Sequence, residues 1–138
     1  MTLAEIIAQM EAAAEGSLEL DLAIHQALGW ELIRFDPGDG DVIEYWRRGE
    51  DEIHADQRRS KYAYTQSLDA ALTLIPEGWF IYGLMDERTP IVYRGDKHKH
   101  LCWTADLQHE DGGRLQSASA KTPALVLCIA ALKARSAP

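Results

Sequence analysis

Apolar residues recur at helical spacing in two stretches of the chain, and both stretches have clear boundaries. The clearest is KTPALVLCIAALKAR, residues 121–135, whose apolar positions form one stripe along a helix. Thr122 is a suitable N-cap, and Pro123 fits the first helical position because its missing N–H is not needed there. Lys133 and Arg135 lie in the last turn, where they favour the negative end of the helix dipole. The pattern predicts an amphipathic helix docked on a sheet.

The second stretch is YTQSLDAALTLIPEGW, residues 64–79, and it follows the same rules. Ser67 can cap the helix, and Pro76 ends it because proline cannot continue the hydrogen-bond ladder. The predicted apolar stripe consists of Leu68, Ala71, Leu72 and Ile75.

Two further helices are predicted near the N-terminus. Residues 2–14 carry an apolar stripe that ends at Gly16. Ser17 caps a second helix, which has Leu18, Leu22, Ile24 and Leu28 as its apolar positions and Gly29 as its stop.

Strands are predicted in the second half of the chain. Residues 79–86 are apolar at nearly every position, which is typical of a central strand covered on both sides. Residues 91–94 form a short strand, and residues 101–108 alternate as a half-buried strand does. Glu110–Gly113 reads as a hairpin turn, so residues 114–120 form the return strand.

The segment from Trp30 to Ala63 lacks a comparable pattern and is predicted to be a variable, charged loop. It contains a loop rich in Asp and Gly at 36–41 and a short strand at 42–46. The fold class that follows is α/β (α+β). We expect an α/β/α sandwich in which a mostly antiparallel sheet of three to five strands is flanked by about four helices. At 138 residues the chain is expected to form a single domain over 1–138.

Composition narrows the functional classes. The formal net charge of −8 disfavours direct binding to nucleic acid, because phosphate backbones would be repelled. No apolar run approaches the length of a membrane span, and the N-terminus has acids where a signal peptide needs basic residues, so we expect a cytoplasmic protein with no membrane partner. Cys102 and Cys128 both lie in apolar patterns and are expected to be reduced.

Three blocks in this order, EAAAEGSLELDLAIHQALG, SLDAALTLIPEGW and TPALVLCIAALKAR, carry a resemblance to a known family. Together they are similar to the phage ABA sandwich domain family. The resemblance implies an α/β/α sandwich, an origin in a tailed phage or prophage, and a location in the bacterial host cell. It carries over no catalytic residue and no cofactor. The chain departs from the family pattern in its charged segment at 49–60 and in Lys97–His100.

Candidate metal and catalytic groups are sparse. His98, His100 and Cys102 would project to one face of a strand, with His109 or Asp106 as a further ligand. The nearby lysines and the absence of usual zinc spacings favour exposed histidines instead, so no metal is expected. Likewise, the aspartates at 36–41 do not match a calcium loop. No catalytic motif is present, His25 is interpreted as structural, and a non-enzymatic protein is expected.

Two hypotheses follow for function, both centred on the charged segment. In the first, the chain binds a host or defence-system protein as an inhibitor, such as an anti-CRISPR, and the acids Glu50, Asp51, Glu52 and Asp56 imitate phosphates. In the second, it sequesters a nucleotide-like immune signal through Tyr45, Trp46, Arg47, Arg48, Arg58 and Arg59. Trp46 could instead pack the loop onto the core. A phage structural or assembly role is a further alternative, and a homodimer is expected if strand 101–108 lies at a sheet edge.

Overall fold

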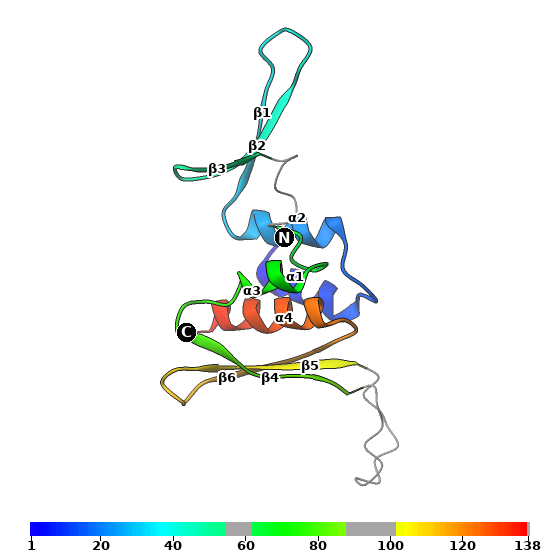
Figure 1. Ribbon diagram of the computed structural model, residues 1–138, viewed down its shortest axis with the longest axis vertical. Coiled ribbons are helices and arrows are strands. Elements are labelled where there is room, and N and C mark those ends of the chain that lie inside the picture. Colours follow the sequence, from blue (N-terminus) through cyan, green and yellow to red (C-terminus); the bar gives the residue numbers. More distant parts are fainter. Residues whose placement is uncertain (55–61, 88–101, 138) are drawn as a thin grey trace.

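The computed structural model describes residues 1–54, 62–87 and 102–137, and these residues form an α+β fold. The described part of the chain contains four helices and two three-stranded antiparallel sheets. Figure 1 shows how these elements are arranged. The helices are α1 (Leu3–Ala12), α2 (Leu18–Ala27), α3 (Leu68–Leu72) and α4 (Pro123–Ser136). Sheet A consists of β1 (Glu31–Phe35), β2 (Ile43–Arg48) and β3 (Asp51–His54), and sheet B of β4 (Trp79–Asp86), β5 (Trp103–His109) and β6 (Leu115–Ala120).

The predicted helix starts are confirmed by their caps. The hydroxyl oxygens of Ser17, Ser67 and Thr122 accept hydrogen bonds from the backbone N–H groups of Leu20, Ala70 and Leu125. Thr2 caps α1 in the same way. Each cap satisfies a donor that would otherwise lack a partner at the helix start.

Helix α4 forms the centre of the molecule. It packs on one face of sheet B, and α1 and α3 contact its other side (Figure 1). Leu125, Ile129 and Leu132 are fully buried, and Cys128 is a buried free thiol, as expected. The arrangement is a sandwich of sheet and helices, with the apolar core around α4. Among the described residues no helix is both long and apolar enough to cross a bilayer.

The order of sheet B differs from the expectation. The strands run β4-β5-β6, so β4 lies at an edge and β5, expected at an edge, is central. Phe80, Tyr82 and Met85 of β4 are 44%, 70% and 55% exposed, so this strand is covered on one face only. The predicted homodimer therefore cannot form by pairing of β5 edges, because both edges of β5 are already hydrogen-bonded.

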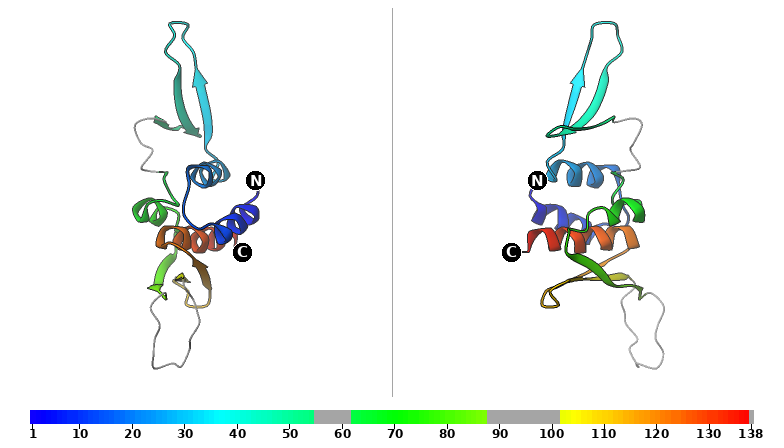
Figure 2. Two further views of the ribbon diagram at one scale, coloured as in Figure 1. Left: turned by 90° about the vertical axis from the view of Figure 1, so that its right-hand side faces the viewer. Right: turned by 60° about the vertical axis from the view of Figure 1, so that its left-hand side comes forward.

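Sheet A replaces much of the loop predicted for 30–63. In Figure 2, β1 and β2 form an arm that projects from the helices, and its tip is the Asp- and Gly-rich loop at 36–41. The strand predicted at 42–46 is confirmed as β2, with bounds Ile43–Arg48. Three apolar residues on the arm, Phe35, Val42 and Ile43, are exposed to solvent. Since apolar residues here are not confined to a buried face, the sequence lacks the alternation of apolar and polar positions that predicts a strand.

The buried faces of α2 and α3 also differ from the predicted stripes. In α3, Leu68 and Leu72 are exposed, whereas Ala70, Ala71 and the following Leu74 are buried. In α2, the buried positions include Leu20, Ala23 and Ile24 but also the polar residues Asp21 and His25. Helix α2 therefore turns a partly polar face towards the protein interior, and this face defines the candidate site.

Candidate functional site

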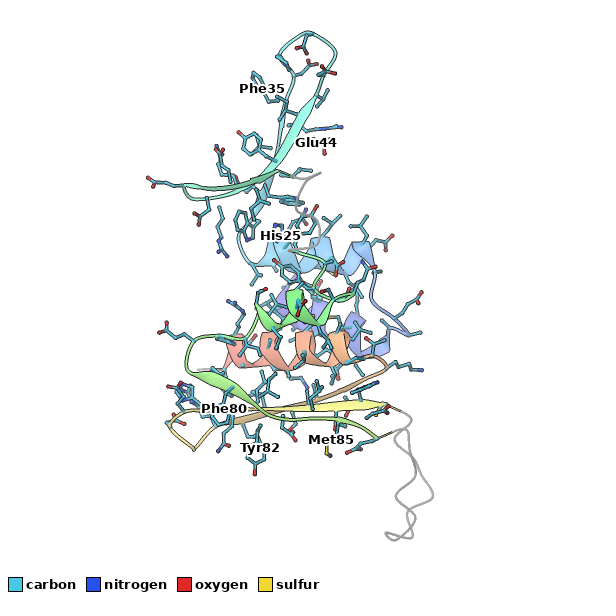
Figure 3. The ribbon with its side chains drawn as sticks, viewed as in Figure 1. His25, Phe35, Glu44, Phe80, Tyr82 and Met85 are labelled. Atoms are coloured by element: carbon cyan, nitrogen blue, oxygen red, sulfur yellow. The ribbon has the colours of Figure 1, made fainter. Side chains whose placement is uncertain are left out.

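His25 is the centre of a buried aromatic cluster that joins α2 to sheet A (Figure 3). Its ring stacks on Trp30 with 5.0 Å between centroids and 5° between planes. Tyr62 stacks on it at 4.7 Å, and Trp46 meets it edge-on at 4.8 Å. The imidazole is therefore held by rings that come from three separate parts of the chain.

The polar atoms of this cluster are only partly satisfied. Nδ1 of His25 and the Tyr64 hydroxyl are joined by a buried 2.8 Å hydrogen bond. Nε2 of His25 and Nε1 of Trp46 have no hydrogen-bond partner among the described residues, although both are buried. Such atoms are uncommon in folded proteins, and each calls for a physical explanation.

Both partners of the His25–Tyr64 hydrogen bond are neutral at physiological pH. Burial, and then the positive charge of Arg48, lower the pKa of His25 to about 4. Burial is also the main cause that raises the pKa of Tyr64 to about 12. The pair consequently offers hydrogen-bonding groups without a charge of its own.

Asp21 fixes the turn that carries Tyr64. Its Oδ1 accepts the backbone N–H of Thr65 at 2.7 Å and the Thr65 hydroxyl at 2.6 Å, and its Oδ2 accepts the side-chain amide of Gln66 at 2.7 Å. Gly16 packs against the same turn so closely that a Cβ atom there would lie 1.9 Å from the Thr65 carbonyl oxygen. These contacts hold Tyr64 against His25.

The aromatic cluster forms one wall of a pocket of about 630 Å³. This volume lies within the range of about 300–1,000 Å³ that is typical of small-molecule sites. The pocket is lined by residues of α2 and the segment after it, of sheet A, of the 62–74 segment and of α4: His25, Leu28, Trp30, Arg48, Ile53, Tyr62, Tyr64, Ser67, Asp69, Ala70, Thr73, Leu74 and Arg135.

Two guanidinium groups line this pocket. The Cζ of Arg48 lies 4.6 Å from the centroid of the Trp30 ring, and Nε of Arg135 donates to the Leu74 carbonyl at 2.7 Å. In the part of the chain that the structure describes, neither arginine forms an ion pair with a carboxylate. Burial, and then the charge of Arg48, lower the pKa of Arg135, so the two cations lie close enough to influence each other. Of the described residues, Asp69 is the one acid that lines the pocket.

The neighbouring arginine has a different environment. Arg47 projects to the opposite face of β2, because side chains alternate along a strand. It lies 3.8 Å from the Glu31 carboxylate and does not line the pocket. Of this adjacent pair, only Arg48 contributes to the site.

The other predicted binding residues are divided between the core and the surface. Trp46 is 2% exposed and behaves as the packing alternative predicted, while Tyr45 is half-buried on the other face of β2. Glu50, Asp51 and Glu52 are exposed at the β2–β3 turn and do not line the pocket. Asp56, Arg58 and Arg59 lie outside the described residues.

The weak metal candidates are divided between the described residues and the rest of the chain. His98 and His100 lie outside the described residues, and Cys102 is half-buried. His109 contacts Asp111 and Trp79 at the β5–β6 turn. Within residues 1–54, 62–87 and 102–137, no group of three or more His, Cys, Asp or Glu side chains could hold a metal ion.

Several pocket residues were missed or assigned another role by sequence reasoning. Arg135 was interpreted through the helix dipole and His25 as structural, and Trp30, Tyr62 and Tyr64 were not assigned to a site. One local signal could have been used. Asp21 and His25 are four residues apart and so lie on one face of α2, together with Leu28. A polar pair on an otherwise apolar face marks a helix side that faces a buried polar network.

The groups that line the pocket are suited to binding: ring faces, two cations and neutral hydrogen-bonding atoms. The sequence matches no protein-family model, and neither curated proteins nor solved structures contain a match to it. The geometry of the pocket is therefore the basis for a functional proposal.

Proposed function

We propose that this chain is a non-enzymatic binding protein that takes a small anion with a planar ring, of the nucleotide-like class, into the pocket beside His25. The observation that carries the proposal is the pair Arg48 and Arg135, which line one pocket and lack a carboxylate partner among the described residues. In a chain of net charge −8, acids are abundant, so composition does not explain two arginines that have no carboxylate partner in the described part of the chain.

An anion satisfies both arginines at once. Two nearby guanidinium groups repel each other, and a phosphate between them replaces this repulsion by attraction. Arginine is also well suited to phosphate, since its planar fork can donate two parallel hydrogen bonds. The aromatic wall of Trp30, Tyr62 and Tyr64 offers ring faces and edges to the rest of the ligand.

Sequestration is the mode of action that fits these groups best. The pocket is lined by ring edges, two guanidinium groups and hydroxyls, which are groups that bind and orient an anionic ligand. On the resemblance to the phage ABA sandwich family, we further propose that the chain acts in an infected bacterial cell. There, removal of a nucleotide-like immune signal would inhibit a host defence.

Native mass spectrometry with a panel of nucleotides tests the proposal. Purified chain is incubated with nucleoside mono- and diphosphates and cyclic dinucleotides, and the mass of each complex is recorded. We expect the wild type to form a one-to-one adduct per pocket and the Arg48→Ala/Arg135→Ala variant to lose it. Arg47→Ala is the matched control and should keep the adduct, since Arg47 faces away from the pocket. An adduct that survives in the double variant would contradict the proposal.

A second candidate function, binding to a host or defence-system protein, is favoured by the exposed apolar residues. Phe35 and Ile43 on the arm are 54% and 42% exposed, and Phe80, Tyr82 and Met85 are exposed on sheet B (Figure 3). Exposed apolar clusters of this kind often mark protein interfaces. Capture from host lysate with the wild type, with Phe35→Asp and with charge reversal at Glu50, Asp51 and Glu52 would test it. Capture that none of these changes weakens would exclude these surfaces.

A further inference from the structure

Sheet A is attached to the helices by a small joint. Within the described residues, no helix packs on a face of sheet A in the way that α4 packs on sheet B (Figure 2). Among the residues of sheet A whose burial the structure describes, Trp46 is the one buried side chain. The joint consists of its ring contacts with His25 and Tyr62 and of the turn at Gly29, where φ is 98°. A region with so few buried apolar contacts opens more easily than the core does.

The two pocket arginines lie on opposite sides of this joint. Arg48 belongs to β2 of sheet A, and Arg135 belongs to the last turn of α4. Both line the same pocket, and the charge of Arg48 is, after burial, a cause of the lowered pKa of Arg135. Arg48 also contacts the end of α2, through a long hydrogen bond of 3.5 Å from Nη1 to the Leu28 carbonyl. The repulsion between the two like charges opposes closure of the joint.

We infer that an anion bound between Arg48 and Arg135 locks sheet A onto the helices, so that occupancy of the pocket controls the arm formed by β1 and β2. This inference rests on the proposed function, because the phosphate of the nucleotide-like ligand is the anion that forms the lock. The arm carries the exposed apolar residues Phe35 and Ile43. The ligand therefore regulates the position of a surface that lies outside its own pocket.

The lock depends on a difference in affinity between the closed and the open joint. One guanidinium group belongs to sheet A and the other to α4, so a phosphate can contact both only when the joint is closed. A ligand that binds one of two states more tightly shifts the population towards that state, and only by its difference in affinity. One hydrogen bond to a charged group is sufficient for a difference of about tenfold or more.

Hydrogen exchange at the Trp46 indole measures the opening of the joint. Nε1 of Trp46 is buried and has no partner among the described residues, so its proton exchanges with deuterated water when the joint opens. Trp46 does not line the pocket, and a nucleotide therefore does not cover the indole directly. The backbone N–H of Ile129, in the buried centre of α4, reports global unfolding in the same NMR spectrum. In the free chain, we expect Trp46 to be less protected than Ile129.

The exchange is then measured with AMP, GMP, CMP and UMP, and calorimetry gives the Kd of each. At about 100 times Kd, a nucleotide that binds only the closed joint should slow the Trp46 exchange by about a hundredfold. Arg135→Ala should bind about tenfold or more weakly and, at the same multiple of its own Kd, slow the exchange by less than about threefold. Arg47→Ala is the matched control and should keep the hundredfold effect, since Arg47 does not line the pocket.

The possible failures are distinguishable. Equal protection of Trp46 and Ile129 in the free chain would mean that sheet A opens only with global unfolding, and this would overturn the inference. Unslowed Trp46 exchange in the saturated wild type, or equal slowing in Arg135→Ala, would also overturn the inference and leave the proposed function intact. Absence of a heat of binding for all four nucleotides would overturn both.

Discussion

The two sides of the molecule are held together by different physical interactions. Around α4, the buried side chains are apolar, and Leu125, Ile129 and Leu132 have no exposed surface. Around α2, the interior includes the carboxylate of Asp21 and the imidazole of His25. Two buried nitrogens there, Nε2 of His25 and Nε1 of Trp46, have no hydrogen-bond partner among the residues that the structure describes. The α4 side has the composition of a core that only stabilises the fold. The α2 side contains groups that are costly to bury, and a ligand would explain why they are there.

The difference suggests a division of work between the two sides. Close packing of aliphatic side chains around α4 gives a rigid support for sheet B and for the 62–74 segment. The pocket lies where that segment meets α2, sheet A and the end of α4. A change on the α4 side should therefore alter stability, and a change on the pocket side should alter binding as well.

The largest effect is expected from Leu132→Ala in α4. Leu132 is fully buried, so its truncation removes apolar contacts and leaves a cavity, which should lower the free energy of unfolding by about 2–5 kcal/mol. Urea unfolding of the wild type and Leu132→Ala measures this change in the free energy of unfolding. Nucleotide binding by the fraction that remains folded should be unchanged. A loss below about 1 kcal/mol would show that the core around α4 is not closely packed.

A slightly smaller effect is expected from Asp21→Ala on the pocket side. The change removes the acceptor of the Thr65 and Gln66 hydrogen bonds and leaves the buried Thr65 N–H unsatisfied, at a cost of about 2–4 kcal/mol. Glu19→Ala, an exposed acid on the same helix, is the matched control and should cost less than about 0.5 kcal/mol. Equal effects of the two substitutions in urea unfolding would show that the hydrogen bonds of Asp21 do not stabilise the fold.

The third prediction concerns pH and His25. The pKa of this group is about 4 in the folded chain and about 6.5 when unfolded, so the unfolded chain binds more protons between these values. The contribution to the free energy of unfolding is therefore full above pH 6.5 and decreases as the pH falls towards 4. The total change should be on the order of 2–3 kcal/mol. Urea unfolding of the wild type and of His25→Phe at pH 7 and pH 4.5 isolates the contribution of His25. If both proteins lost the same free energy of unfolding between these pH values, the lowered pKa of His25 would be contradicted.

The smallest effect is expected from Tyr82→Ser on the outer face of sheet B. Tyr82 is 70% exposed, and surface substitutions of this kind change the free energy of unfolding by about 0.5 kcal/mol or less. Nucleotide affinity should be unaltered, because the residue lies on β4, away from the pocket. A clear loss of either property would mean that this face is covered in solution.

The helices were predictable because their signals are local. Thr2, Ser17, Ser67 and Thr122 each cap a helix within three residues of themselves, and the β5–β6 hairpin follows from the Glu110–Gly113 turn. Sheet A was largely missed because its apolar residues do not alternate with polar ones in the sequence. Phe35, Val42 and Ile43 are apolar and yet exposed in the structure. The edge position of β4 depends on which strand pairs with which, and this is not encoded in the apolar pattern of one strand.

The site was less predictable than the fold for a related reason. Arg48, one of the predicted ligand-binding candidates, lines the pocket, and an arginine beside aromatic residues is a local signal that the sequence shows directly. Its partner in the pocket, Arg135, is 87 positions further along the chain and also fits a role in the last turn of α4. The environment of His25 depends on its contacts with Trp30, Tyr62 and Tyr64, which only the tertiary fold brings together.

The most direct test of the account is a calorimetric titration of AMP, GMP, CMP and UMP into the wild type, Arg48→Ala/Arg135→Ala and Arg47→Ala. The account predicts saturable binding of at least one nucleotide to the wild type and to Arg47→Ala. In the double variant, the affinity should be lower by tenfold or more, since each hydrogen bond to a charged group contributes about 1.5–3 kcal/mol. Equal affinity in all three proteins, or no heat of binding in the wild type, would contradict the claim that Arg48 and Arg135 form an anion site.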